Sequence, residues 1–202
     1  NIPDFKKSTK RLAVKLNTSG ERSVLQGHPW VFESSIEKIN KEGQSGDITV
    51  IFRKRDNAFI GVGLYDAASP IRIKMLHHGE PITINSAFFK SKIDAAFKKR
   101  ALLLKTNTTS YRLLFGENDG FPGLIVDVYA NVLVVKMYSE IWLGYIKDIT
   151  EMLINVSKTE TVVMRLSRNL QQVDFGLVDG AVIYGTLENE VVKFMEHLFF
   201  FF

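Results

Sequence analysis

A change in hydrophobic periodicity near residue 80 is the feature that most constrains the fold of this chain. Residues 11–76 contain short segments in which apolar and polar side chains alternate, as in "GDITVIFR" and "IRIKML". Alternation with period two is typical of strands, and Gly20, Gly43 and Gly46 supply turn signals between them. No long helical period interrupts this pattern. Residues 1–76 are therefore predicted to form a small all-β barrel or pseudo-barrel.

The pattern changes to a helical period after a connector at residues 77–85. One face of the predicted helix in "SAFFKSKIDAAFKKRALLLK" carries Phe89, Ile93, Phe97, Ala101 and Leu104. Ser86 is a plausible N-cap for this helix. Residues 123–138 read as a hairpin that turns at Ala130–Asn131, and residues 140–156 as a second helix. The predicted fold class is α+β: the small β pseudo-barrel is followed, over residues 86–196, by an α+β domain with two helices packed on an antiparallel or mixed sheet.

Composition excludes several classes of site. The 202 residues contain no cysteine, so disulfides, thiolate zinc sites and a thiol nucleophile are excluded within this chain. No apolar run approaches the ~18 residues that a membrane span needs. The first residues, "NIPDFKKSTKRLAVKL", are basic but have no apolar core of the kind found in signal peptides. We therefore expect a cytoplasmic protein without a membrane partner.

Charge is distributed unevenly along the chain. Residues 1–110 hold 19 Lys and Arg against 10 Asp and Glu, a net charge of +9, whereas residues 111–202 hold 7 against 12, a net charge of −5. A basic segment of this kind is expected where a protein binds a polyanion such as nucleic acid. Solvated surface lysines would give the same count.

Several residues in the basic part could contact RNA. "RKRD" at residues 53–56 ends a predicted strand, where basic side chains suit phosphate contacts, although a solvated hairpin tip explains it equally well. In "LQGHPWVF" we expect His28 to be exposed, where it could stack on a base, and Trp30 and Phe32 to fill the barrel core. The candidate contacts are Arg22, His28, Arg53, Lys54, Arg55, Arg72 and Lys74, with Lys98, Lys99 and Arg100 as a secondary patch.

The stretch "GENDGFPGLIVDVY" at residues 116–129 carries the carboxylates Glu117, Asp119 and Asp127. Carboxylates at this density could perform acid–base chemistry or bind a hard metal ion. However, "NDG" and "FPG" are turn sequences that lead into a strand, and no His or Lys lies within the stretch. A tight loop that holds the carboxylates for hydrogen bonds is the structural alternative.

The sequence lacks the common nucleotide and hydrolase motifs. A cofactor site on a Rossmann-like sheet needs a strand, a glycine-rich turn and a helix in close order, and no G-x-G-x-x-G occurs here. There is also no P-loop, no H-E-x-x-H and no G-x-S-x-G.

Two segments in this order resemble a known family. "RSVLQGHPWVFESSI" with "GDITVIFRKRDNAFIGVGLYDAASPIRIKML" is similar to the N-terminal PUA domain of bacterial S-adenosylmethionine-dependent ribosomal-RNA methyltransferases, most closely the family that makes 5-methylcytosine in large-subunit RNA. "YRLLFGENDGFPGLIVDVYANVLVVKMYS" resembles the central domain of that family. The likeness covers about residues 11–197. The matching motif positions are Arg112, Gly116, Glu117, Asp119, Gly120, Pro122, Gly123 and Asp127.

The resemblance also indicates what is missing from these residues. The family carries a glycine-rich cofactor turn and a nucleophilic cysteine in a Rossmann-like domain after this point, and neither occurs here. The resemblance therefore implies a truncated, RNA-binding and substrate-presenting portion that has no catalytic residue, metal site or S-adenosylmethionine site of its own. Its implied partners are ribosomal RNA, the missing catalytic methyltransferase domain and a second copy of the chain in a homodimer.

Two other functions stay open at this point. One is a small stand-alone enzyme that uses Glu117, Asp119 and Asp127. The other is a non-enzymatic assembly module, in which the apolar tail at residues 197–202 docks onto a partner chain.

Overall fold

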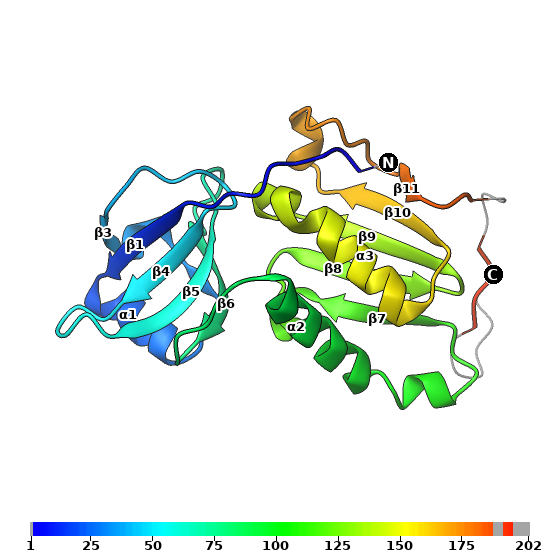
Figure 1. The fold of residues 1–202 in the computed structure, drawn as a ribbon, viewed down its shortest axis with the longest axis horizontal. Helices are drawn as coiled ribbons and strands as arrows, with labels where there is room; N and C mark the ends of the chain where they lie inside the picture. Colours follow the sequence, from blue (N-terminus) through cyan, green and yellow to red (C-terminus); the bar gives the residue numbers. More distant parts are fainter. Residues whose placement is uncertain (1, 188–191, 196–202) are drawn as a thin grey trace. The chain divides into compact units, whose positions relative to one another are not determined.

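The computed structural model describes residues 2–187 and 192–195, which form two compact units (Figure 1). The barrel unit comprises Phe5–Thr83 together with Glu140–Gly144. The α+β unit comprises Ile84–Ser139, the residues from Tyr145 on and the short stretch before Phe5. The division after Thr83 falls in the segment that the sequence assigns to a connector, and the apolar tail at 197–202 lies outside the described residues.

A six-stranded mixed sheet builds the barrel unit, with the strand order β2-β6-β5-β4-β1-β3. Strand β1 runs parallel to β4, and the other neighbours are antiparallel. The elements are β1 (Arg11–Leu16), α1 (Thr18–Leu25), β2 (Trp30–Val31), η1 (Glu33–Ser35), β3 (Ile36–Ile39), β4 (Ile48–Phe52), β5 (Phe59–Tyr65) and β6 (Ile73–His78). The predicted all-β character of residues 11–76 is thus correct except at α1.

The core of the barrel unit is formed by alternate residues of its strands. Leu12, Val14 and Leu16 of β1 are fully buried, as the period of two predicts. Val24 of α1 packs into the same cluster. Helix α1 therefore covers part of the inward-facing side of the sheet, and its remaining residues face outward.

Helix α1 was not predicted, because eight residues are too few to show a helical period. It begins at the N-cap Asn17, whose side chain accepts a hydrogen bond from the amide of Gly20 at 2.8 Å. Within the helix Gly20 and Val24 are the buried residues, which leaves almost no apolar stripe to read. Gly20 is held closely, since a Cβ there would lie 2.7 Å from that of Ser35.

The prediction that Trp30 and Phe32 fill the barrel core is wrong for both residues. Val31 is the inward residue of β2 and is 2% exposed, whereas Phe32 is 44% exposed and Trp30 is half-buried. Neighbouring side chains of an extended chain point to opposite faces, so burying Val31 turns both aromatic residues away from the core. His28 is exposed, as predicted.

A five-stranded mixed sheet with the order β11-β10-β9-β8-β7 builds the α+β unit. Strands β9 and β10 are parallel and joined through α3, while the other pairs are antiparallel, which confirms the predicted mixed α+β class. Helices α2 and α3 lie against each other on one face (Figure 1). The elements are α2 (Ser86–Lys99), η2 (Leu103–Lys105), β7 (Ser110–Phe115), η3 (Gly116–Asp119), β8 (Leu124–Tyr129), β9 (Val132–Met137), α3 (Ile146–Ser157), β10 (Thr161–Leu166), η5 (Leu170–Gln172) and β11 (Val182–Tyr184). Between β9 and α3 the chain passes through η4 (Glu140–Tyr145), which except for Tyr145 belongs to the barrel unit.

Helix α2 is shorter than its apolar pattern suggests. Phe89 and Ile93 are buried as predicted, but the helix ends at Lys99, and Ala101 and Leu104 are exposed beyond it. Its N-cap is Asn85 rather than Ser86, because the Asn85 side chain accepts a hydrogen bond from the amide of Phe88 at 3.0 Å. The early end matters, since it places Lys99 and the C-cap Arg100 beside strand β7.

Within the described part of the chain, no helix is both long enough and apolar enough to span a membrane.

The position of the N-cap can be tested by two adjacent substitutions. We expect Asn85→Ala to lower the free energy of unfolding by about 1 kcal/mol, because it removes the oxygen that satisfies the first turn of α2. Urea denaturation followed by circular dichroism measures this change. Ser86→Ala is the matched control, and an equal or larger loss there would contradict the assignment of Asn85.

Candidate functional site

The predicted basic residues of the barrel unit separate into two groups, and the first forms one surface beside α1. The amide of Lys54, in the β4–β5 turn, donates to the Glu21 carboxylate on α1 at 2.7 Å. The loop after α1 folds back onto the helix, since the amide of His28 donates to the carbonyl of Ser23 at 3.0 Å. We call the surface formed by Arg22, His28, Arg53, Lys54 and Arg55 the α1–hairpin surface.

Asp56 organises the tip of this hairpin. Its carboxylate accepts from Arg53 Nε at 2.9 Å and from Arg55 Nε at 3.3 Å. The hydrogen bond from Arg53 is the largest of the effects that lower the pKa of Asp56 to about 2. Arg55 still has 78% of its side chain exposed. Asp56 therefore shapes the turn without removing Arg55 from solvent.

His28 is held in place at the other end of the α1–hairpin surface. Its Nδ1 accepts from the amide of Trp30 at 3.2 Å, and its ring meets the indole edge-on at 6.0 Å between centroids. A ring nitrogen of His78 donates to the carbonyl of His28 at 3.0 Å. The imidazole is thus an exposed ring with a fixed orientation, and Arg22 on α1 is also exposed.

Arg72 and Lys74 form the second group, and internal partners occupy both of them. Lys74 Nζ lies 2.6 Å from Asp66 Oδ2, and these two side chains are 9% and 4% exposed. Arg72 pairs with Glu33 at 2.8 Å and donates to the carbonyl of Asp66 at 3.2 Å. Because both side chains are paired with carboxylates inside the barrel unit, neither residue belongs to a surface that is open to a partner molecule.

In the α+β unit the stretch at 116–129 forms a tight loop centred on Asp119. Its Oδ2 accepts from the amide of Phe115 at 2.8 Å. Lys99 Nζ lies 2.9 Å from Oδ1, and Arg100 Nη2 lies 2.6 Å from Oδ2. The side chain of Asp119 is 2% exposed. Lys99 and Arg100, two residues of the predicted secondary patch, are therefore bonded to a buried carboxylate of the predicted motif. Lys98, the third member of the patch, is exposed on α2.

Glycines permit the sharp turns of this loop. Gly120, Gly123 and Gly116 have φ values of 76°, 72° and 48°, a region that favours glycine. Pro122 lies buried between two of these turns. The chain therefore reverses direction within a few residues and delivers Asp119 to the end of α2.

Asp127 has a separate structural role. It lies opposite Arg112 in the β7–β8 register, and the two side chains pair with Arg112 Nε 2.8 Å from Asp127 Oδ1. The Arg112 guanidinium also stacks over Phe115, 5.1 Å from the ring centroid. Asp127 therefore fixes Arg112 on the surface of the sheet.

These contacts remove the main support for a carboxylate enzyme. Asp119 and Asp127 are each paired with their own basic residues, and Glu117 lies half-buried in η3. Among the described residues, no group of three or more His, Cys, Asp or Glu side chains is placed to hold a metal ion. The loop with its turn chemistry is the interpretation that the geometry supports.

The described residues of the α+β unit line two cavities that bear on function. The first, of about 570 Å³, is lined by Lys99, Arg100, Arg112, Asn118 and Asp119 among others. Arginine and lysine side chains around an open cavity suit a phosphate-bearing ligand. We call this the Asp119 cavity.

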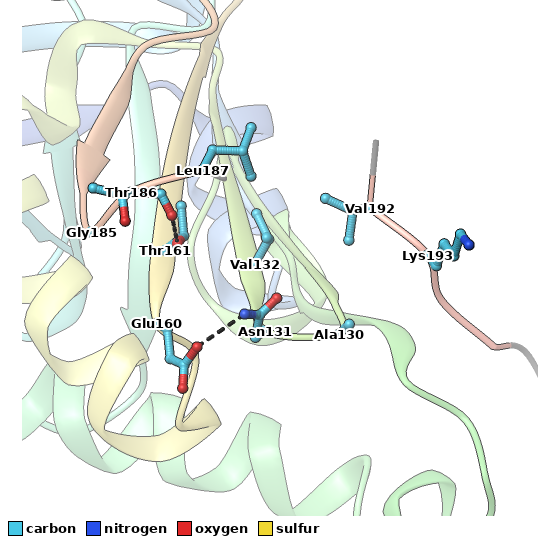
Figure 2. Close-up of a pocket in the computed structure, with 10 residues that line it drawn as sticks. All are labelled: Ala130, Asn131, Val132, Glu160, Thr161, Gly185, Thr186, Leu187, Val192 and Lys193. Atoms are coloured by element: carbon cyan, nitrogen blue, oxygen red, sulfur yellow. Dashed lines mark hydrogen bonds between the residues drawn. The ribbon is translucent and has the colours of Figure 1, made fainter. Parts of the chain in front are cut away.

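The second cavity, of about 350 Å³, is polar and lies at the starts of β9 and β10 (Figure 2). Asn131 Nδ2 donates to the Glu160 carboxylate at 3.0 Å, and Thr161 Oγ1 donates to the carbonyl of Thr186 at 2.7 Å. We assign no ligand to this cavity.

Comparison with known proteins relates the geometry of the barrel unit to a family. Residues 14–78 match the family model described as a PUA-like domain. The barrel unit is a PUA-like domain. This match covers α1, β6 and all five residues of the α1–hairpin surface, although only the fold follows from it.

Longer relatives match nearly the whole chain. A protein of Deinococcus radiodurans described as a ribosomal RNA large subunit methyltransferase is 41% identical over 196 residues, which cover 94% of this chain and 48% of that protein. A ribosomal RNA large subunit methyltransferase I of Pseudoalteromonas atlantica is 34% identical over 127 residues, 62% of this chain and 32% of that protein. The chain thus spans half or less of the length of these curated relatives.

Solved structures share the fold. A protein of Streptococcus mutans assigned as an S-adenosylmethionine-dependent methyltransferase superposes with a TM-score of 0.75 at 16% identity, covering 91% of this chain and 46% of the other. A second structure, described as a methyltransferase complexed with SAH, gives 0.75 at 17% identity and covers 93% and 46%.

The described residues do not fit S-adenosylmethionine. Cofactors on α/β sheets bind beyond the carboxyl ends of parallel strands, at a glycine-rich turn into a helix. The β9–α3–β10 crossover instead enters α3 through η4, and the polar cavity lies at the amino ends of these strands. We therefore assign no part of methyl transfer to these residues.

The buried ion cluster of Asp119 makes a testable pH dependence. Burial favours the neutral acid, but hydrogen bonds from Arg100, Lys99 and the Phe115 amide outweigh it and lower the pKa of Asp119 to about 2. A lowered pKa stabilises the fold above the unfolded value near 3.8, and this contribution is lost as the pH falls from about 4 to about 2. The difference in unfolding free energy between wild type and Asp119→Asn should shrink over that range.

At neutral pH we expect Asp119→Asn to destabilise the α+β unit by about 3–5 kcal/mol, because two cations lose their buried counterion. Urea denaturation at a series of pH values measures both effects. Asp94→Asn, which removes an exposed helical carboxylate paired with Lys90, is the control. A loss at Asp119 that stays constant between pH 2 and 7 would contradict the ion-pair account.

Proposed function

We propose that this chain is the RNA-binding and substrate-presenting portion of an S-adenosylmethionine-dependent ribosomal-RNA methyltransferase. The α1–hairpin surface of the PUA-like domain would bind the RNA backbone, and the Asp119 cavity would provide a second contact with the RNA. The single observation that carries the proposal is the exposed group of Arg22, His28 and Arg55 on this domain. The names of the two curated relatives support the choice of ribosomal RNA.

The chemistry of the α1–hairpin surface favours unpaired RNA. Arginine side chains contact phosphates without regard to sequence, whereas an exposed imidazole with a fixed ring offers a stacking face. Stacking needs a base that is not already paired in a helix, so loops and single strands are the better ligands. Arg53 and Lys54 pair with Asp56 and Glu37, but their side chains stay 30% and 52% exposed, so we keep them in the proposed contact set. We leave out Arg72 and Lys74, whose paired side chains are only 14% and 9% exposed.

The methyl acceptor that we propose is C5 of cytosine in large-subunit RNA, on the basis of the sequence resemblance. Transfer to this carbon requires covalent attack on the base by a thiolate. The 202 residues contain no cysteine, so in this proposal the nucleophile is not among them. The role of the chain is to hold and orient the RNA. A homodimer also stays a prediction, which light scattering at several concentrations can test.

Salt dependence tests the proposed RNA contact. We expect a single-stranded fragment of ribosomal RNA to bind, and Arg22→Ala combined with Arg55→Ala to make the log–log salt slope shallower by about 1.4, because two phosphate contacts are lost at about 0.7 each. Fluorescence anisotropy at several salt concentrations measures the slope.

Lys147→Ala combined with Arg168→Ala is the matched control, since it removes the same charge from exposed positions of the α+β unit. Equal slopes for the two double variants would overturn the proposed surface. Calorimetry with S-adenosylmethionine alone should give no binding heat, and a measurable heat would contradict the fit argument above.

A further inference from the structure

Lys92 occupies an unusual place beside the Asp119 loop, and nothing in the sequence singles it out. It lies on α2 two turns before Lys99, on the same side of the helix. Its ammonium lies 5.0 Å from the centroid of the Phe88 ring. It also lies against the turn at Gly120, where a Cβ would come within 2.5 Å of Lys92 Nζ. The absence of a side chain at Gly120 therefore makes the room that Lys92 occupies.

This lysine has no anionic partner in the described part of the chain. The carboxylate of Asp119 is already shared by Lys99 and Arg100. At this turn Lys99 and Arg100 are bonded to Asp119 while Lys92 lies against Gly120, which leaves an excess of positive charge at the junction of α2 and η3. Burial, and after it the charge of Lys99, lowers the pKa of Lys92. Both effects mean that a bound anion would stabilise the ammonium form.

We propose that Lys92 and Lys99, with the Asn118–Gly120 turn between them, form a binding site for a phosphate group of the RNA backbone. Lys99 has 59% of its side chain exposed, so it can contact a ligand while it keeps its bond to Asp119. Asn118 is exposed at the same turn and lines the Asp119 cavity. The site extends this cavity toward Gly120.

The choice of a phosphodiester follows from charge and geometry together. Compact ammonium groups bind phosphate as point charges, whereas bidentate recognition of a carboxylate is the usual task of arginine. Arg100 is 14% exposed and already holds Asp119 from two nitrogens, so it is not free to receive a second carboxylate. This inference rests on the proposed function as far as the phosphate belongs to RNA.

The test compares Lys92→Met with Lys90→Met on the same helix. Lys90 is exposed and paired with Asp94 at 2.7 Å, so the two substitutions remove equal charge from different faces. We expect Lys92→Met to weaken binding of single-stranded ribosomal RNA and to make the log–log salt slope shallower by about 0.7, while Lys90→Met leaves both unchanged. Thermal unfolding of each variant serves as the folding control.

A structural role would behave differently. If Lys92 only supported the fold, Lys92→Met would lower stability, whereas removal of a desolvated charge without a counterion should leave stability unchanged or raise it. Nitrogen-15 NMR of the lysine ammonium groups gives a second readout. Addition of the RNA fragment should raise the pKa of Lys92, because a bound phosphate favours the charged form.

The outcomes separate this site from the proposed function. If wild type binds RNA and Lys92→Met binds it with equal affinity and slope, the site is wrong and the proposed function stands. If wild type does not bind RNA, the proposed function fails, and with it the assignment of the phosphate to RNA. Inorganic phosphate is the third arm: a pKa rise with phosphate but not with RNA would identify a free-anion site and overturn the assignment to the RNA backbone.

Discussion

The buried carboxylate of Asp119 is the interaction on which the arrangement of the α+β unit depends. It joins the last turn of α2 to the loop after β7 through two cations and one backbone amide. A buried charge of this kind is tolerated because every lone pair that faces the protein has a donor. Arg100 is the C-cap of α2, and its guanidinium reaches Asp119 from that position. The turns at Gly116, Gly120 and Gly123 serve the same purpose from the other side.

The state of each cation separates structural from functional basic residues in this protein. Lys74 and Arg100 are nearly buried and paired, and their charges stabilise the units in which they lie. Arg55 stays exposed although its turn is shaped by a neighbouring carboxylate. Lys92 is a third kind, since it is partly desolvated and is repelled by the charge of Lys99. A count of Lys and Arg along the sequence treats these three kinds alike, whereas a polyanion can interact only with the second and third.

The sequence predicts the fold class well because periodicity is a local property. The strands of the barrel, the hairpin at Ala130–Asn131 and the buried face of α2 up to Ile93 all follow from patterns of a few residues. Helix α1 is not predicted because its buried residues are only Gly20 and Val24, which give no recognisable apolar stripe. The ion pairs of the basic residues could not be predicted from the sequence for another reason. Asp119 lies 20 residues after Lys99, and such a pairing is decided by tertiary packing and not by any spacing in the sequence.

The dependence on tertiary packing also explains why the roles of the glycines in the central motif could be predicted only in part. The sequence identifies "NDG" as a turn, and the positive φ of Gly120 agrees with that. It does not reveal that Gly120 has a second constraint, because the neighbour that needs its missing side chain lies 28 positions earlier, on α2. Gly120 therefore adopts the positive φ that the turn needs and also leaves room for the side chain of Lys92. Because the end of a lysine side chain is flexible and can shift, the backbone conformation is the stronger reason for a glycine there.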